Sequence, residues 1–485
     1  MEKVTHVDVR MYGVGTGDCF ALKFFSGKKT LFKMMIDAGT WQGKKNHLAN
    51  YVKDLKEYVD NKVDLLVVTH EHKDHVYLFD VCEEMFLNDF EVDEIWMSWA
   101  ENDLDEKVKI WKDQYGQKKK AFTDAVTELS SDKTKRAIKK QFQGVNGNED
   151  LIKSFENFKY SLNDFRDLHL SLDSNGKYKG GLKGMEIVKN KIANGNIRYL
   201  KPGDIVSIKG LESVNFNILG PPQSSKAIKK EHGNKTETYD HNKVLRKSDL
   251  FGSVIGSKET FDSKFAFNAE YVSDTVKLSK FYNKKSEAWR AIGQDWLIKG
   301  AGDLALRLNT GINNLSLAMA IEFEESGRVM LFPGDAEFGS WESWHNIDWG
   351  KKGKGDKHLT EDLLNRTVFY KVSHHLSHNG TAKEKGLEMM NSDDLVAMAT
   401  LDFNIIGYNW KNTMPNRAIL KELLAKTKGR LIIMNESKLF YDFNEKIPLT
   451  TKIENERMRM NKVELNEFEK SYQEAKLYKQ YRVKA

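Results

Sequence analysis

Cysteine and long apolar runs are scarce in this sequence, and each scarcity excludes a class of protein. The only cysteines are Cys19 and Cys82, and neither belongs to a Cys-x-x-Cys pair, so a disulfide framework is excluded. No window approaches the run of about eighteen apolar residues that a membrane span needs, and the first residues lack the basic-then-apolar order of a secretory signal. We therefore expect a cytoplasmic protein without a membrane span.

Proline and net charge are also low. Six prolines and 30% charged residues favour a helix-rich α/β protein over a disordered chain. The 76 lysines and arginines exceed the 70 acidic residues by only 6 in a chain of 485, which is too small a surplus to indicate a general coat of nucleic acid.

The first hundred residues show a strand and helix pattern. Two apolar segments, 4–12 and 19–25, read as strands joined by a glycine-rich turn, and apolar spacing from Asn46 predicts a helix. Val63 to Thr69 then reads as a buried parallel strand. This order predicts an α/β fold in which His70 lies at the carboxyl end of a strand, where such sheets place their sites.

The residues directly after that strand have the spacing of metal ligands. The segment contains His70, His72, Asp74 and His75. In a short turn these side chains can converge, so that His70 and His72 hold one cation while Asp74 and His75 hold a second, roughly 3.5–4 Å away. The alternative is a charged surface turn that is rich in histidine by chance.

Two later segments supply further ligands. Asp335 follows the apolar strand Arg328 to Phe332, so its carboxylate could bridge both metals, although a Gly-Asp pair after a strand is often a plain turn. The segment that follows the strand Thr367 to Val372 carries three further histidines: His374, His375 and His378. We expect metal or proton-transfer chemistry there, with a surface loop as the alternative.

The histidine motif resembles the metallo-β-lactamase superfamily. Five accompanying segments resemble the soluble hydrolase domain of the competence protein ComEC and its stand-alone relatives: Gly13 to Cys19, Ile36 to Gly39, Asn314 to Leu317, Gly334 to Glu337 and Lys371 to Ser377. The resemblance implies a four-layered αβ/βα sandwich over residues 1–445, with its core at about 4–100, 195–222 and 310–435. It leaves helical insertions at about 101–190 and 223–300, and a charged, helical tail at 446–485.

Roles follow from the resemblance position by position. The implied metal ligands are His70, His72, Asp74, His75, Asp335 and one or both of His374 and His375. The implied supporting residues are Asp18, Asp37 and Asn314, and Lys371 is a candidate substrate contact. This chain departs from the family in having Leu376 in place of a glycine and in lacking both a histidine before the Asp335 strand and one near Met414.

Two cations about 4 Å apart acidify a shared water and clamp the oxygens of an in-line displacement, as phosphodiester hydrolysis requires. We expect Asp74 and Asp335 to orient the resulting hydroxide, and His378, or whichever of His374 and His375 is not a ligand, to protonate the leaving oxygen. The nitrogen and oxygen donors favour Zn²⁺ and also allow Mn²⁺. The candidate phosphate contacts are Lys118, Lys119, Lys120, Lys226, Lys229 and Lys230.

Three classes of function stay open. A nuclease or phosphodiesterase acting on nucleic acid comes first, because the resemblance is to a DNA-degrading domain. A hydrolase of small esters, amides, lactones or thioesters comes second, using the same metals. The third is a binding or structural module, or an effector, for example in defence against foreign DNA, that is silent until a protein partner binds the 101–190 insertion or the C-terminal tail.

Overall fold

The structure is a computed structural model of the 485-residue chain. It describes residues 2–132, 171–172, 178–179, 181–230, 233–234, 236–239, 308–350, 358–377, 380–406, 414–442 and 445–485, with a few single positions between 136 and 167. The chain divides into two compact units. The first contains Met1–Val108, Ser171–His241 and Thr310–Ala485, and the second contains Lys109–Leu170 and Asn242–Asn309.

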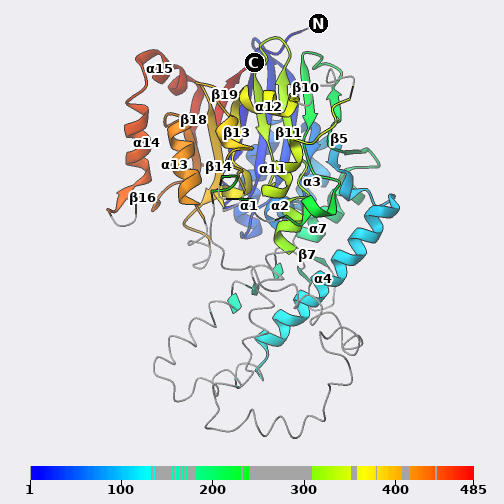
Figure 1. The fold of residues 1–485 in the computed structure, drawn as a ribbon. Coiled ribbons are helices and arrows are strands. Elements are labelled where there is room, and N and C mark those ends of the chain that lie inside the picture. The colour runs from blue at the N-terminus through cyan, green and yellow to red at the C-terminus, as the bar shows by residue number, and fades with distance from the viewer. Residues whose placement is uncertain are drawn as a thin grey trace, which may run out of the picture. The chain divides into compact units, whose positions relative to one another are not determined.

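Two large mixed sheets form the frame of the first unit, as Figure 1 shows, so the expected α/β class is confirmed. The first sheet contains, in spatial order, β18 (Tyr472–Glu474), β19 (Tyr478–Lys484), β1 (His6–Tyr12), β2 (Cys19–Ser26), β3 (Lys29–Ala38), β4 (Lys62–Val67), β5 (Glu91–Ser98) and β8 (Ile197–Leu200). The strands from β3 to β8 are parallel to one another.

The second sheet contains, in spatial order, β15 (Leu431–Asn435), β14 (Val396–Asp402), β13 (Thr367–Lys371), β12 (Val329–Phe332), β11 (Met319–Phe323), β10 (Val214–Ile218) and β9 (Ile205–Ser207). The strands from β12 to β15 are parallel, whereas β9, β10 and β11 run antiparallel to their neighbours. The parallel strands of each sheet therefore present several carboxyl ends along one edge.

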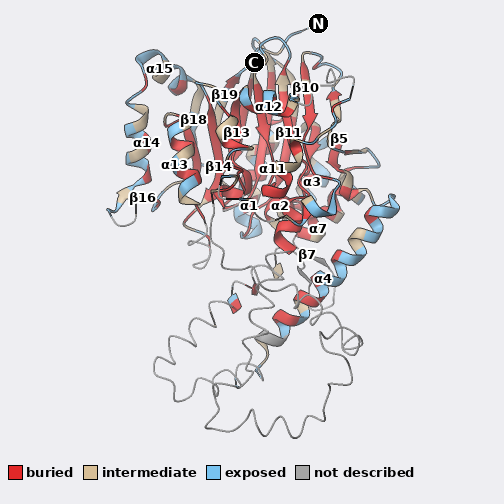
Figure 2. Cartoon of the chain, in the orientation of Figure 1, coloured by how far each residue is buried: buried red, intermediate tan, exposed pale blue. Residues whose placement is uncertain are grey.

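Three apolar clusters fix the layers. One cluster joins inward-facing residues of both sheets, among them Phe20, Phe216 and Phe332, so the sheets pack face to face. The other two lie between each sheet and its helices, and Figure 2 shows buried residues throughout the strands. The first sheet is covered by α1 (Lys45–Tyr58), α2 (Lys73–Val81), α3 (Glu83–Asp89) and α7 (Gly181–Ile187). The second is covered by α11 (Phe338–Trp344), α12 (Leu359–Asn365), α13 (Arg417–Lys426) and α14 (Leu449–Arg457).

The expected helical tail is wrong for its last part. After α14 and α15 (Lys462–Ser471) the chain forms β18 and β19, and β19 pairs antiparallel with β1 from His6 to Tyr12. The physical reason is that successive side chains of a strand point to opposite faces of the sheet. Val483 and Tyr481 face the core between the sheets, while the charged Arg482 on the other face is paired with Asp8. The tail is thus part of the first sheet.

The insertions are also shorter than expected, because residues 171–190 and 223–239 belong to the first unit. Helix α7 packs closely on α2: a Cβ at Gly184 would lie 2.1 Å from the carbonyl oxygen of Val76, so only glycine allows this approach. Helix α4 (Glu106–Ser130), whose residues from Lys109 onward belong to the second unit, confirms the helical character expected at the start of the 101–190 insertion and carries Lys118, Lys119 and Lys120. None of the described helices combines the length and apolar character that a membrane crossing needs.

The shorter described elements are η1 (Trp99–Glu101), β6 (Ser171–Leu172), β7 (Tyr178–Lys179), η2 (Val188–Ile192), α8 (Ser225–Ile228), η7 (Ser373–Leu376), η8 (Leu387–Met389), β16 (Phe440–Asp442) and β17 (Ile447–Pro448).

Candidate metal centre

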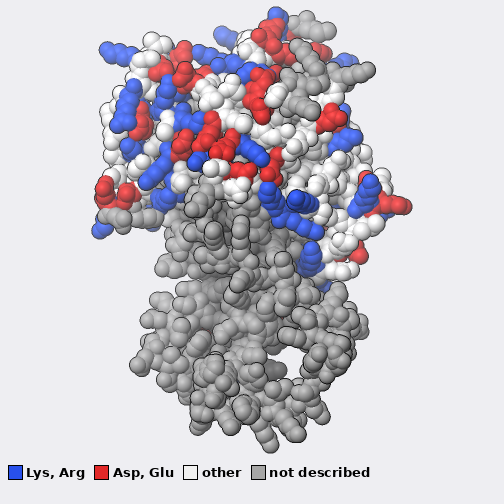
Figure 3. Space-filling view, in the orientation of Figure 1, with Lys and Arg blue, Asp and Glu red and all other residues white. Residues whose placement is uncertain are grey.

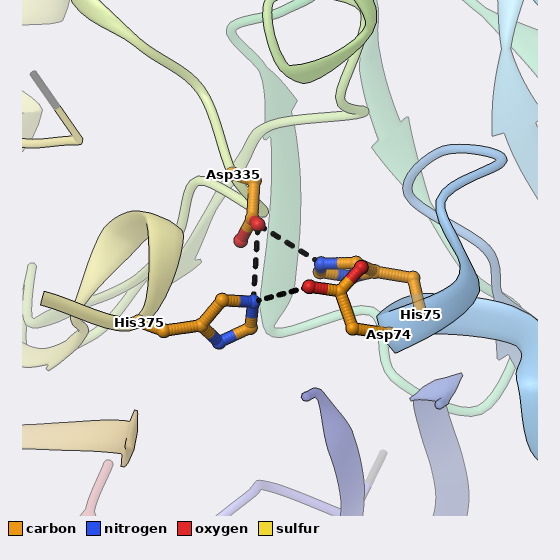
Figure 4. A group of neighbouring side chains, drawn as sticks. All are labelled: Asp74, His75, Asp335 and His375. Carbon is orange, nitrogen blue, oxygen red and sulfur yellow. Dashed lines mark hydrogen bonds and ion pairs between the residues drawn. The ribbon is translucent and has the colours of Figure 1, made fainter. Parts of the chain in front are cut away.

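Four side chains from three separate segments converge at the carboxyl ends of the central strands (Figure 4). Asp74 and His75 lie in the first turn of α2, shortly after β4, whereas Asp335 follows β12 and His375 follows β13. Because β12 and β13 are parallel neighbours, the segments that follow them begin at the same edge of the second sheet. All four side chains are buried, so the fold dedicates interior space to them.

The spacing of the ligand atoms fits a small divalent cation. Asp74 Oδ2 lies 3.1 Å from His375 Nε2, and Asp335 Oδ2 lies 3.2 Å from the same nitrogen and 3.1 Å from His75 Nε2. A tetrahedral Zn²⁺ with bonds of about 2.0–2.1 Å separates its ligand atoms by about 3.3 Å. In addition, Asp74 Oδ1 is buried and has no hydrogen-bond partner among the described residues. The donor set therefore fits a metal ion.

His75 is oriented from behind by the predicted supporting residue Asp37. The Nδ1 of His75 lies 2.7 Å from Asp37 Oδ2, and this carboxylate also accepts from the backbone and hydroxyl of Thr69, at 2.8 and 2.6 Å. A histidine that donates through one nitrogen to a carboxylate presents the other as a metal ligand. The turn after Asp37 packs closely against the first turn of α2, since a Cβ on Gly39 would lie 2.2 Å from the backbone of Asp74 and His75.

Lys371 supports the centre from within the protein. Its side chain is 2% exposed, and its Nζ lies 3.2 Å from Asp335 Oδ1, donates to the carbonyl oxygen of Gly334 at 2.9 Å and forms an ion pair with Asp18. The ammonium group has internal acceptors, as burying a charge requires, and the expectation that Lys371 contacts substrate stays a prediction. Lys371 holds the predicted supporting residue Asp18 and the ligand Asp335 in place.

His375 is the residue of the histidine cluster that joins the four-residue group, and its backbone is in an unusual conformation. His374, His375 and Leu376 have φ of 48°, 50° and 65°, the left-handed region that costs a non-glycine residue roughly 1–2 kcal/mol. A glycine, which the resemblance implies at position 376, would adopt this φ freely. Thr400 fixes the ring, with its hydroxyl 2.8 Å from His375 Nδ1 and donating to Asp18 Oδ1 at 2.6 Å.

The charges of the centre stabilise one another strongly. Burial alone would raise the pKa of Asp74, but the hydrogen bond from His375 and the charge of His75 lower it to about 2. Burial would likewise lower the pKa of His375, yet Asp335 and Asp74 raise it to about 9. The pKa of His75 is well above its ordinary value despite burial, because Asp335, Asp37 and Asp18 surround it. A metal ion must displace these protons when it binds.

His70 and His72 form a separate pair next to this centre. His70 Nε2 lies 3.0 Å from His72 Nδ1, and both residues are buried. Burial and the neighbouring His75 hold the pKa of His70 well below its ordinary value, so its imidazole is neutral. Neither residue joins the four-ligand group.

His374 lies apart from the metal ligands, although it was predicted as one. Its Nε2 lies 3.2 Å from Asn313 Nδ2, and its Nδ1 lies 3.4 Å from Glu337 Oε1. The predicted supporting residue Asn314 ties this region together, because its Oδ1 accepts from the backbone N–H of Glu337 and of Ser340, at 3.0 and 3.1 Å. Asn314 thus fixes the chain just after Asp335.

The structure therefore brings together Asp74, His75, Asp335 and His375. His378, the expected proton donor, lies outside the described residues. Sequence reasoning missed Glu337, which stood in a quoted motif segment. It also missed Thr400, for which no local signal exists.

Comparison with known proteins assigns no role to these residues. No protein-family model matches this chain. No curated protein matches it either. The likeness to the metallo-β-lactamase superfamily therefore rests on the motif residues alone.

Proposed function

We propose that this protein is a metal-dependent hydrolase of the metallo-β-lactamase type that cleaves phosphodiester bonds in nucleic acid. The observation that carries the proposal is the buried set of Asp74, His75, Asp335 and His375, which come from three segments and whose ligand atoms all lie within 4.8 Å of one another, with three pairs at 3.1–3.2 Å. Zn²⁺ suits these nitrogen and oxygen donors best, and Mn²⁺ suits them as well. A bound ion of this kind polarises a phosphoryl oxygen and lowers the pKa of water.

The protein's own groups prepare the site for that chemistry. Asp37 holds His75 with its Nε2 toward the centre, and Lys371 neutralises one oxygen of Asp335. Asp74 Oδ1 has no hydrogen-bond partner among the described residues, so it is the group available to accept a proton from an attacking water. Because these side chains are buried and tied to one another, they need little reorganisation during the reaction.

The choice of a phosphodiester is supported by two exposed lysines near the Asp335 loop. Lys226 and Lys229 are exposed; Lys226 lies within the short helix α8, and Lys229 is its C-cap residue. Asn314 donates to the carbonyl oxygen of Ile228 at 3.1 Å, which anchors α8 to the segment that follows Asp335. The predicted phosphate contact Lys230 is already paired with Glu342 at 2.7 Å. Figure 3 shows acidic and basic side chains intermixed on the described face, so any phosphate attraction is local.

The decisive experiment combines metal analysis with hydrolysis of bis-p-nitrophenyl phosphate and plasmid DNA. We expect wild type to retain metal and cleave both, and Asp335→Asn to lose more than about 100-fold in rate, since losing even an outer partner of a ligand costs about 10–100-fold. Glu57→Gln, a change of an exposed side chain on α1, is the control and keeps full activity. Metal-loaded protein that cleaves neither substrate would refute the phosphodiesterase assignment.

The role of the two lysines is tested through salt dependence. The double variant Lys226→Ala with Lys229→Ala should weaken DNA binding and lower the slope of log affinity against log salt by about 2, because each phosphate contact contributes about 1. Lys209→Ala is the matched control: it is exposed, but it lies in the turn between β9 and β10, at the opposite end of the sheet from the centre. An unchanged slope in the double variant would remove α8 from the substrate path.

A further inference from the structure

The hydroxyl of Thr400 determines which nitrogen of His375 carries a proton toward it. Thr400 Oγ1 donates to Asp18 Oδ1 at 2.6 Å, and Asp18 can only accept there because it is a carboxylate paired with the ammonium group of Lys371. A hydroxyl has one proton, so the Thr400 oxygen accepts from His375 Nδ1, which lies 2.8 Å away. The Nδ1 atom of His375 is therefore the protonated one on this side of the ring.

This assignment decides which atom of His375 faces the other ligands. With Nδ1 held by Thr400, the ring directs Nε2 to Asp74 Oδ2 at 3.1 Å and to Asp335 Oδ2 at 3.2 Å, as Figure 4 shows. Nε2 is thus the nitrogen that offers its lone pair to a metal ion. Thr400 and Asp18 are buried, at 0% and 1% exposure, so solvent does not compete for their contacts.

The other histidine of the centre has a different kind of orienting partner. The Nδ1 of His75 lies 2.7 Å from the carboxylate of Asp37, with no hydroxyl between them. The Nδ1 of His375 lies 3.6 Å from the nearest carboxylate oxygen of Asp18, which is too far for a direct hydrogen bond. Thr400 fills that gap, so the charge of Asp18 reaches His375 through a neutral oxygen.

Asp18 also connects to a second ligand of the centre. It pairs with Lys371, whose ammonium group lies 3.2 Å from Asp335 Oδ1. One branch of contacts from Asp18 therefore runs through Thr400 to His375, and the other runs through Lys371 to Asp335. A change confined to the hydroxyl of Thr400 interrupts the first branch and leaves the second intact.

We infer that Thr400 is a positioning residue, which relays the charge of Asp18 to His375, keeps a proton on Nδ1 of this ring and so presents Nε2 to the metal ion. This inference rests on the proposed function, which supplies the ion. Outer partners of ligating histidines change metal affinity or activity by about 10–100-fold. We expect an effect of that size from the loss of the Thr400 hydroxyl.

The test compares Thr400→Val with Thr400→Ser in the full-length chain. Valine keeps the shape of threonine without its hydroxyl, whereas serine keeps the hydroxyl. In Co²⁺-loaded protein, the Nδ1 protons of His75 and His375 give separate paramagnetically shifted NMR signals that disappear in heavy water. Thr400→Val should shift or lose the His375 signal alone and weaken Co²⁺ binding by about 10–100-fold, and Thr400→Ser should keep both signals and the affinity.

Thr367→Val is the matched control. Thr367 is buried like Thr400, and its hydroxyl donates to the carbonyl oxygen of Leu363 at 2.9 Å, at the amino end of β13. This variant should leave both NMR signals and the Co²⁺ affinity unchanged, so an effect of Thr400→Val is not a general result of removing a buried hydroxyl.

The inference is overturned if Thr400→Val keeps both signals at their wild-type positions, or if Thr400→Ser changes them as much as Thr400→Val does. A readout without metal keeps the test independent of loading. In metal-free protein with isotope-labelled histidine, the His375 Nδ1 proton, assigned by its absence from His375→Asn, should exchange with solvent faster in Thr400→Val, and equal rates would contradict the relay. Failure of the proposed function is separate: it appears as absent hydrolysis while the signals respond to Thr400→Val as described.

Discussion

Replacing Lys371 by methionine should destabilise the metal-free protein far more than loss of an ordinary ion pair. The side chain is 2% exposed and its ammonium group pairs with Asp18 and Asp335, so its removal takes one positive charge away from two buried carboxylates. Breaking such a buried pair costs about 3–5 kcal/mol. Methionine retains most of the volume of the lysine stem, so the loss reports on the charge. Metal added at about 100 times its Kd should restore about 2.7 kcal/mol.

The assay is urea denaturation followed by tryptophan fluorescence, with and without metal. Lys230→Met is the matched control, because Lys230 pairs with Glu342 at 2.7 Å but its side chain is 33% exposed, and exposed pairs contribute about 0–1 kcal/mol. If Lys371→Met lost no more of the free energy of unfolding than Lys230→Met, the description of Lys371 as the internal counter-ion of the centre would be refuted.

Three further predictions concern packing, pH and the C-terminal strands. Gly39→Ala should weaken Co²⁺ affinity by about 10-fold or more, because its Cβ would lie 2.2 Å from the Asp74 backbone, whereas Gly116→Ala, with nothing within 4 Å, should leave affinity intact. The pKa of His375 is raised from 6.5 to about 9, so its contribution to the stability of the metal-free protein is full below pH 6.5 and is lost as the pH rises to about 9. Co²⁺ affinity should rise over the same pH range, because the metal competes with that proton. Unfolding curves and Co²⁺ titrations measured across this range test the expected fall in stability and rise in affinity. Truncation after Ser471 removes β18 and β19 and exposes the edge of β1, so light scattering should detect aggregation that a truncation of Ala485 alone does not cause.

The position of the candidate site was predictable because its residues follow strands. Continuous apolar runs before His70, Asp335 and His375 each indicated a buried strand, and parallel strands bring their carboxyl ends to one edge. The resemblance implied supporting roles for Asp18 and Asp37, and the structure places both carboxylates beside His75.

The rest depended on distant partners. Thr400 is one polar residue in an apolar strand. The residues it contacts, His375 and Asp18, are 25 and 382 positions away in the sequence, so no local pattern indicated its role. The charge of the last residues obscured a strand because the ion-pair partner of Arg482, Asp8, lies near the other end of the sequence. Lys371 resembled a surface cation for the same reason, since its acceptors come from other segments.

The pairing of β1 with β19 also governs when the protein can fold. Asp8 and Arg482 form an ion pair although they are 474 positions apart in the sequence. One edge of β1 therefore stays without its partner strand β19 until the chain has been synthesised almost to Lys484. At about 5–20 residues per second, the first strand waits tens of seconds or longer for its partner. Closing so long a loop carries a large entropic barrier, which slows folding. The nascent chain therefore exposes an unpaired strand edge throughout synthesis. We expect the yield of folded protein to depend on how well chaperones cover β1 during that time.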